Sequence, residues 1–171
     1  MQTIHLNCDL GEGGKYDALL MPNISACNIA CGGHAGDEET MLKTVLLALE
    51  NNVEIGAHPS YPDKENFGRL SLEISGKDLK KSILEQLNSL HTIVKMQGRK
   101  LTHIKPHGAL YNDAVQDEKK ARIILNSIAE SGLDLKLYAP QNSIISELAK
   151  GEIEVVFEAF ADRNYNEDYT L

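Results

Sequence analysis

The chain has 171 residues, enough for one domain with a hydrophobic core. Hydrophobic residues make up 42% and charged residues 25%, ordinary values that exclude wholesale disorder. The net charge of −8 argues against nonspecific binding to nucleic acid or an anionic membrane, since both reward positive charge. The sequence has no membrane-spanning apolar run, no secretory leader at its start and only three cysteines, so we expect a cytoplasmic protein with reduced thiols.

The first half of the chain alternates predicted strands and helices. An alternating run predicts a strand at residues 3–8, and a run of small and apolar residues predicts another at 24–31. A helix is expected over 37–51, where Asp37 can cap the first turn and apolar residues recur at helical spacing. A strand at 53–58 follows, and then a long loop rich in turn residues.

The second half continues this alternation. The expected elements are a helix from Ser75 or Asp78 to about Gln97, a strand at 101–105, a helix at 117–131, a strand at 133–139, a short helix at 141–150 and a strand at 153–160. Such alternation favours an α/β fold with a parallel sheet, either open or closed into a barrel. A complete eight-unit barrel takes about 250 residues, so a barrel formed by this chain would be incomplete at its C-terminal end. Residues 1–171 are predicted to form a single domain.

Acidic and imidazole side chains stand at the ends of the predicted strands. Asp9 follows the first strand, His34 the second and His107 the fourth, while His58 ends the third. The carboxyl ends of parallel strands open onto one face, so we expect these four side chains to converge there. Aspartate and neutral imidazole can bind a divalent metal such as zinc, or can act as general base and acid in hydrolysis. The residue pattern leaves both interpretations open. In a third, structural interpretation, Asp9 caps a turn and the histidines are structural residues of their loops.

Other polar residues give weaker signals. The glycine-rich segment 11–16 is not a phosphate-binding loop, because two positions lack the glycine and the hydroxyl residue that the motif needs. It does supply Glu12 as a second carboxylate. Lys105 and Arg69 are the best candidates to hold an anionic group near the strand ends, with solvated surface charge as the alternative. The histidines that do not end a strand are interpreted as structural: His5, His91 and His103.

Five segments, in this order, resemble the LamB/YcsF family. They are LNCDLGEG, LMPNISACNIACGGHAGD, IGAHPSYPD with FGR, HIKPHGALYN and EAFADRNY, and together they run from residue 4 to about 170. The resemblance implies a βα barrel of the glycoside hydrolase/deacetylase type. One departure is Gly33, where the family usually has an aromatic residue, and this glycine is expected to loosen its loop.

The resemblance also implies a reaction. The chain would be the A subunit of an ATP-dependent 5-oxoprolinase, which opens the lactam of 5-oxo-L-proline to L-glutamate together with subunits B and C. ATP would be the co-substrate of the complex, and a divalent metal remains possible. The implied catalytic residues, which are also the possible metal ligands, are Asp9, His34, His58 and His107. The expected substrate-binding residues are Glu12, Asn28, Arg69, Lys105, Asn112, Glu158, Asp162 and Arg163.

Two alternative functions remain open from the sequence. A metal-dependent carbohydrate deacetylase would hold zinc and release acetate from an acetylated sugar. A non-catalytic, truncated binding subunit would be inactive even with subunits B and C. In each case an unclosed sheet would expose edge strands, so we expect a homo-oligomer or a swapped assembly.

Overall fold

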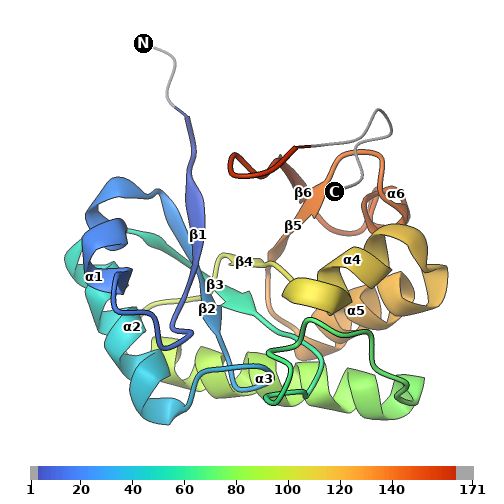
Figure 1. Cartoon of the computed structure of the whole chain (residues 1–171), viewed down its shortest axis with the longest axis horizontal. Coiled ribbons are helices and arrows are strands. Elements are labelled where there is room, and N and C mark those ends of the chain that lie inside the picture. The colour runs from blue at the N-terminus through green and yellow to red at the C-terminus, as the bar shows by residue number, and fades with distance from the viewer. Residues whose placement is uncertain (1–3, 165–171) are drawn as a thin grey trace.

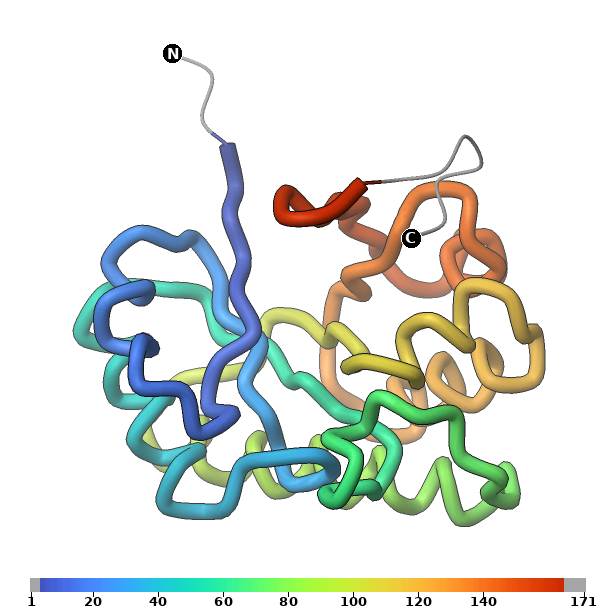
Figure 2. The backbone as a smooth tube through the Cα atoms, viewed as in Figure 1, coloured from blue at the N-terminus to red at the C-terminus, as the bar shows by residue number. Residues whose placement is uncertain are grey.

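The computed structural model describes residues 4–164, and its centre is one parallel sheet. The six strands follow each other across the sheet in chain order. The strands are β1 (Asn7–Leu10), β2 (Ala26–Ala30), β3 (Glu54–His58), β4 (His103–Ile104), β5 (Lys136–Pro140) and β6 (Val155–Glu158). The sheet curls into half of a βα barrel, so that β1 and β6 rise on opposite sides of its interior (Figures 1 and 2). The predicted α/β class and parallel sheet are therefore confirmed.

Helices connect the strands and cover the outside of the curled sheet (Figure 1). They are α1 (Asp17–Leu20), the 3-10 helix η1 (Met21–Asn23), α2 (Glu38–Glu50), α3 (Gly76–Met96), α4 (Gly108–Gln116), α5 (Glu118–Ser131) and α6 (Ile144–Leu148). Helix α3 packs against α2 and α5, and α5 packs in turn against α4 and α6. Within residues 4–164, none of these helices combines the length and the apolar character that crossing a membrane requires.

Side-chain caps fix where the main helices begin. Asp37, Ser75, Asp117 and Ser143 each accept a hydrogen bond from a backbone N–H in the first turn of α2, α3, α5 and α6, respectively. Such a cap stabilises a helix by about 1 kcal/mol because it satisfies a donor that has no partner inside the helix. The choice between Ser75 and Asp78 is thus settled in favour of Ser75.

The core lies between the sheet and its outer helices. Every residue of β2 is buried, as is typical of a parallel strand with both faces covered. The apolar face of α3, which includes Leu79, Ile83, Leu87 and Leu90, is completely covered. This packing holds the strand ends rigidly in place, and these ends carry the polar residues.

Three regions differ from the sequence expectations. The short helices α1 and η1 form in a segment where the sequence predicted no helix. The strand expected at 101–105 pairs only over His103–Ile104, and the segment that follows it forms α4, a helix that the sequence did not predict. Pro106 precedes α4 and Gly108 is its first residue, and these two residue types mask the helical pattern. The strand expected at 3–8 pairs only from Asn7 onward, and its first residue lies outside the described part of the chain.

Candidate active site

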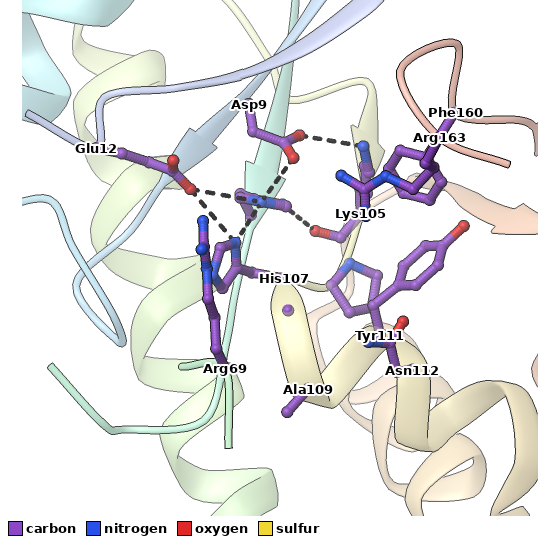
Figure 3. Close-up of a pocket in the computed structure, with 13 residues that line it drawn as sticks. Asp9, Glu12, Arg69, Lys105, His107, Ala109, Tyr111, Asn112, Phe160 and Arg163 are labelled. Atoms are coloured by element: carbon purple, nitrogen blue, oxygen red, sulfur yellow. Dashed lines mark hydrogen bonds and ion pairs between the residues drawn. The ribbon is translucent and has the colours of Figure 1, made fainter. Parts of the chain in front are cut away.

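A pocket of about 360 Å³ opens at the carboxyl ends of the strands (Figure 3). Asp9 reaches it from β1, His58 from the last position of β3, and Lys105 and His107 from the segment after β4. The ring of His34, in the loop after β2, stacks on the ring of His107 with their centroids 3.6 Å apart. The structure thus brings together the four residues that the sequence placed at strand ends.

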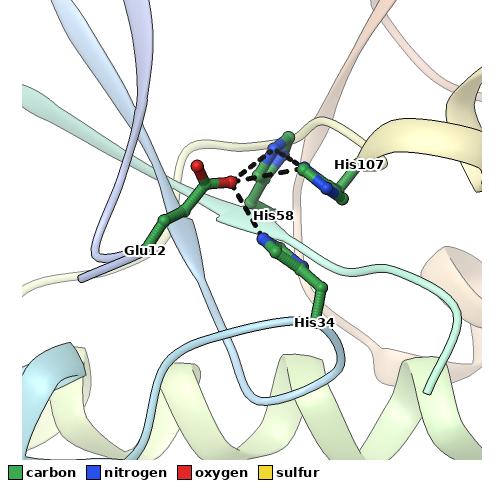
Figure 4. Close-up of side chains that lie close together, drawn as sticks. All are labelled: Glu12, His34, His58 and His107. Carbon is green, nitrogen blue, oxygen red and sulfur yellow. Dashed lines mark hydrogen bonds and ion pairs between the residues drawn. The ribbon is translucent and has the colours of Figure 1, made fainter. Parts of the chain in front are cut away.

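The carboxylate of Glu12 points toward the three histidines (Figure 4). Its Oε1 is 2.9 Å from His34 Nε2, 3.3 Å from His107 Nδ1 and 3.8 Å from His58 Nε2. One ligand atom from each of these four residues lies within 4.8 Å of all the others. Asp9, which the sequence grouped with the histidines as a metal ligand, contacts only His58 among them, at 3.4 Å. Glu12 therefore completes the cluster, which we call the Glu12–histidine cluster.

Backbone contacts hold His107 in place. Its own N–H donates to the carbonyl of Pro59 at 2.8 Å, and the N–H of Ala109 donates to the carbonyl of Gly68 at 2.9 Å. Gly108 has a φ of +53°, and a Cβ there would lie 2.6 Å from the Gly68 carbonyl oxygen. The loop after β3 and the start of α4 thus approach each other more closely than a side chain at Gly108 would permit.

A buried glutamine fixes the backbone just after His58. The side chain of Gln86, on α3, donates to the carbonyl of Ser60 at 2.9 Å and accepts from the Ser60 N–H at 3.0 Å. A Cβ at Gly33 would lie 2.3 Å from Ser60 Oγ and 2.5 Å from Gln86 Oε1. The loop that carries His34 is therefore closely packed at Gly33, and the expectation that this glycine loosens it is wrong.

In His58 and His107, one ring nitrogen faces Glu12 and the other faces a backbone carbonyl; we call them the inner and the outer nitrogen. The position of the proton on the outer nitrogen decides whether the inner one carries a proton in the neutral ring. His58 Nδ1 lies 2.6 Å from the carbonyl oxygen of Lys105, and His107 Nε2 lies 2.9 Å from that of Phe67. A carbonyl oxygen only accepts, so both outer nitrogens carry a proton. The inner nitrogens, His58 Nε2 and His107 Nδ1, are 2.9 Å apart, and in neutral rings both present lone pairs. Two lone pairs at this distance require a cation, either a shared proton or a metal ion.

The surroundings keep much of this cluster neutral. Burial lowers the pKa of His107 to about 4, and the neighbouring charges of His58 and His34 act in the same direction. Burial is also the main cause of the lowered pKa of His34. For Glu12, burial alone would raise the pKa, but the hydrogen bond from His34 and the nearby histidines lower it overall. Neutral imidazoles around a carboxylate are the donor set of a zinc-type site.

Asp9 and Lys105 form a second charged group beside this cluster. Asp9 Oδ1 accepts from Lys105 Nζ at 3.1 Å and from Asn28 Nδ2 at 2.8 Å. Burial would raise the pKa of Asp9, but His58, Lys105 and the Asn28 hydrogen bond together lower it well below the usual range. Lys105 Nζ also lies 3.5 Å from Glu158 Oε2. The buried ammonium therefore balances two carboxylates.

The remaining predicted residues lie around this centre in different ways. Arg69, from the loop after β3, and Arg163, from the segment after β6, line the pocket together with Asn112 of α4 (Figure 3). Asp162 is exposed, lies outside the lining of this pocket, and accepts a hydrogen bond from Arg163 Nε at 3.1 Å.

Two predicted residues lie in the interior rather than at the pocket wall. Asn28 is fully buried on β2, below Asp9. Glu158 accepts from Asn7 Nδ2 at 3.0 Å, which links the edge strands β6 and β1 across the inside of the sheet.

Sequence reasoning missed several residues of the site. Tyr111 and Phe160 line the pocket, and Phe67 lies edge-on to the rings of His34 and His107. All three stand inside the segments that carry the family resemblance, where the sequence analysis did not single them out. His103 was interpreted as structural, yet its side chain contacts Asn28 in the interior. The periodicity of a two-residue strand carries no signal for that contact.

A curled parallel sheet with carboxylates and histidines at its strand ends defines a protein of the βα-barrel type. Residues 4–171 match the model of the LamB/YcsF family, and the chain belongs to that family. It is 46% identical to a Bacillus cereus protein named as the A subunit of 5-oxoprolinase, with 100% of this chain and 70% of the relative covered. A Pyrococcus abyssi protein of the same name is 44% identical, with 98% and 68% covered.

A solved structure has the same fold. The crystal structure of the lactam utilization protein from Thermus thermophilus matches with a TM-score of 0.94 and 35% sequence identity. The match covers 99% of this chain and 71% of that one. The barrel type expected from the sequence is thereby supported for the half-barrel that the described residues form.

Proposed function

We propose that this chain acts as the A subunit of a 5-oxoprolinase and opens the lactam of 5-oxo-L-proline to L-glutamate. Relatives at 42–46% identity carry that name, and the matching Thermus structure is titled a lactam utilization protein. The observation that carries the proposal is the pocket itself. It joins an ionised carboxylate, Asp9, to the Glu12–histidine cluster, and two arginines lie at its wall.

The pocket suits a small cyclic amide with a carboxylate. Arg69 and Arg163 line it, and guanidinium groups bind carboxylates and phosphates through paired hydrogen bonds. Lys105 was expected to share this role, but its ammonium lies between Asp9 and Glu158. We therefore propose that Arg69 and Arg163 are the main residues that bind the substrate carboxylate, or a phosphate added to the substrate.

Asp9 is the residue of this chain best placed to move a proton. Its Oδ1 is held by Lys105 and Asn28, whereas its Oδ2 faces His58. Water attacks the ring carbonyl carbon and gives a proton to Asp9 Oδ2. The C–N bond then breaks, and Asp9 returns this proton to the departing nitrogen. Lys105 stays beside Asp9 and stabilises its charge before and after the transfer.

A divalent metal ion fits the Glu12–histidine cluster. His58 and His107 present lone pairs inward because their outer nitrogens donate to backbone carbonyls, an arrangement typical of metal-binding histidines. Glu12 and His34 would complete a set of three nitrogens and one oxygen, which suits zinc. When bound, such an ion makes a water molecule more acidic and polarises a carbonyl group.

Metal analysis of the purified chain tests this site. After incubation with zinc and removal of the excess, we expect about one ion per chain by mass spectrometry of the metal content. The changes Glu12→Gln and His58→Gln should each lower the zinc affinity, whereas His91→Gln on α3 should leave it unchanged. If wild-type protein retains no zinc, manganese or cobalt, the cluster holds a shared proton instead.

ATP and partner subunits belong to the same proposal. Segment 11–16 lacks the pattern of a phosphate-binding loop, so ATP would be used by the complex with subunits B and C, which would transfer a phosphoryl group to the lactam oxygen and release ADP. Ring opening by water would then leave an acyl phosphate, and a second water would convert it to glutamate and inorganic phosphate. This assembly would work in the cytoplasm.

Reconstitution tests the function directly. The chain is mixed with subunits B and C, ATP and 5-oxo-L-proline, and glutamate is measured over time. His58→Ala should abolish glutamate formation while circular dichroism shows an intact fold, and His91→Ala serves as the matched control. Glutamate formation at the wild-type rate in the His58→Ala complex would remove His58 from the site.

A further inference from the structure

A chain of hydrogen bonds runs beneath the pocket, from β4 through β2 to Asp9. Thr102 Oγ1 lies 2.8 Å from His103 Nδ1, and His103 Nε2 lies 2.8 Å from Asn28 Oδ1. Asn28 Nδ2 then donates to Asp9 Oδ1 at 2.8 Å and to Asn7 Oδ1 at 2.7 Å. Both His103 and Asn28 are completely buried, so water cannot take the place of either side chain in the hydrogen bond between them.

Only one direction of donation is consistent along this chain. The carboxylate of Asp9 accepts and cannot donate, so the NH₂ group of Asn28 must face it. The amide oxygen of Asn28 therefore faces His103, whose Nε2 must carry the proton. His103 Nδ1 is then an acceptor, so the single hydrogen of the Thr102 hydroxyl points to Nδ1 at 2.8 Å rather than to the carbonyl oxygen of Ile55, which lies 3.2 Å away. The orientation of one histidine ring thus determines which end of the Asn28 amide faces Asp9.

The ring of His103 is held in place by its neighbours. It stacks on Tyr138 with centroids 4.1 Å apart and an angle of 12°. On β3, Gly56 pairs with His103, and a Cβ there would lie only 2.1 Å from His103 Nε2. The ring occupies the space that a side chain at Gly56 would need. Burial is the main reason why the pKa of His103 falls to about 3, so the ring stays neutral near pH 7.

We propose that His103 is a positioning residue for lactam opening, which locks the Asn28 amide and thereby orients Asp9. With both N–H groups of Asn28 committed to Asn7 and Asp9, the free oxygen Oδ2 of Asp9 stays directed at His58. Without His103, the amide can turn and present its oxygen to the carboxylate, which repels it. This inference rests on the proposed function, but it concerns a residue outside the pocket wall.

Paired substitutions at His103 test the role in the reconstituted complex. His103→Leu removes both hydrogen bonds at similar volume, and we expect kcat to fall by about 10–100-fold, the range for losing an outer partner of a site residue. KM should change much less, because the arginines that hold the substrate are untouched. His103→Gln keeps a side-chain N–H within reach of Asn28 and should restore most of kcat. His91→Leu, the same change on α3, is the matched control and should leave kcat unchanged.

A second variant covers the case in which His103→Leu does not fold. Thr102→Val removes only the hydroxyl that fixes the His103 tautomer, at nearly constant volume, and should lower kcat in the same direction by a smaller factor. Equal losses of kcat in the Leu and Gln variants, or wild-type kcat in both His103→Leu and Thr102→Val, would overturn the proposal.

A readout that does not depend on the reaction separates this inference from the proposed function. The side-chain NH₂ of Asn28 should give two resolved, slowly exchanging signals by NMR in the wild-type chain. These signals should move or broaden in His103→Leu and return toward the wild-type positions in His103→Gln. A wild-type complex that makes no glutamate would refute the proposed function, whereas unchanged Asn28 signals in folded His103→Leu protein would refute the positioning role.

Discussion

At the scale of single residues, the interior separates charged from neutral polar groups. The ammonium of Lys105 lies 3.1 Å from Asp9 Oδ1 and 3.5 Å from Glu158 Oε2, so opposite charges are placed together in a poorly solvated part of the site. His103, two residues earlier, lies among neutral partners and is neutral. His103 on β4 and Lys105 just after it therefore lie in different electrostatic surroundings, the first among neutral groups and the second between carboxylates.

The neutral state of His103 makes stability depend on pH. Its pKa is about 3 in the folded chain, against about 6.5 in an unfolded one. Between these values the unfolded chain binds more protons, so the contribution of His103 is complete above pH 6.5 and is lost as the pH falls toward 3. The slope reaches about 1.4 kcal/mol per pH unit.

Urea unfolding at several pH values between 4 and 7 measures this dependence. The wild-type free energy of unfolding should decline more steeply on acidification than that of His103→Gln, which cannot take up a proton. Parallel curves for the two proteins would show that His103 titrates alike in both states.

The cysteines should differ in reactivity. Burial raises the pKa of Cys27 and Cys31 to about 12, so almost no thiolate is present at pH 8. Cys8 is only half-buried, although its pKa is also raised, mainly by burial. Iodoacetamide at pH 8, followed by mass spectrometry, should label Cys8 first and the other two only in urea. Rapid labelling of Cys31 in the folded chain would contradict its placement in the core.

The sequence predicted part of this site for a clear physical reason. Asp9 lies near the end of β1, His58 ends β3, and His34 and His107 follow β2 and β4. Topology alone brings such positions together. The central place of Glu12 depends on how a glycine-rich loop folds back, which no periodic pattern records.

At the scale of elements, the loop after β3 and helix α4 shape the site most, and both were hard to predict. The loop has no regular pattern, and α4 begins in a proline- and glycine-containing segment. Long-range contacts fix them instead. Tyr61 donates its hydroxyl hydrogen to Asp113 on α4 at 2.6 Å, and Ser71 contacts the other oxygen of Asp113 at 2.7 Å. The well-patterned helices α2, α3 and α5 form where the sequence predicted them, since caps and apolar spacing are local signals.

Gln86 should contribute strongly to the stability of the protein, because it holds the backbone of the loop after β3. Gln86→Leu removes two hydrogen bonds to the backbone of Ser60 and leaves that buried N–H and carbonyl without this partner. We expect the free energy of unfolding to fall by about 1–3 kcal/mol, as for other unsatisfied buried polar groups. Urea denaturation measures the loss.

An exposed glutamine provides the comparison for this change. Gln116 lies at the exposed end of α4, so Gln116→Leu should change stability by less than about 0.5 kcal/mol. Equal stability of the Gln86→Leu and Gln116→Leu proteins would show that the Ser60 backbone finds other partners.

At the scale of the whole molecule, alternation of strands and helices predicted a parallel sheet but left open whether that sheet is open or curled into a barrel, and so did not give its strand order. Side chains make contacts across the inside of the curled sheet, where Lys105 lies 3.5 Å from Glu158 of β6 and Asn7 of β1 donates to the same carboxylate. The contact between Asn7 and Glu158 joins residues 151 positions apart in the chain and leaves no mark in the local sequence. Among the described residues, β1 and β6 each pair with a neighbouring strand on one side only.

The edge strands β1 and β6 lead us to predict that the chain associates with copies of itself. An edge strand offers backbone groups to another chain, and the edges here carry exposed apolar side chains, with Leu6 50% and Phe157 55% exposed. We expect the purified chain to form a homo-oligomer in light scattering across a concentration series. Phe157→Lys places a charge on β6 and should shift the distribution toward monomer, whereas Leu46→Lys, an equivalent change on α2, should not. A wild-type chain that stays monomeric at every concentration, or variants that shift equally, would rule out association through this edge.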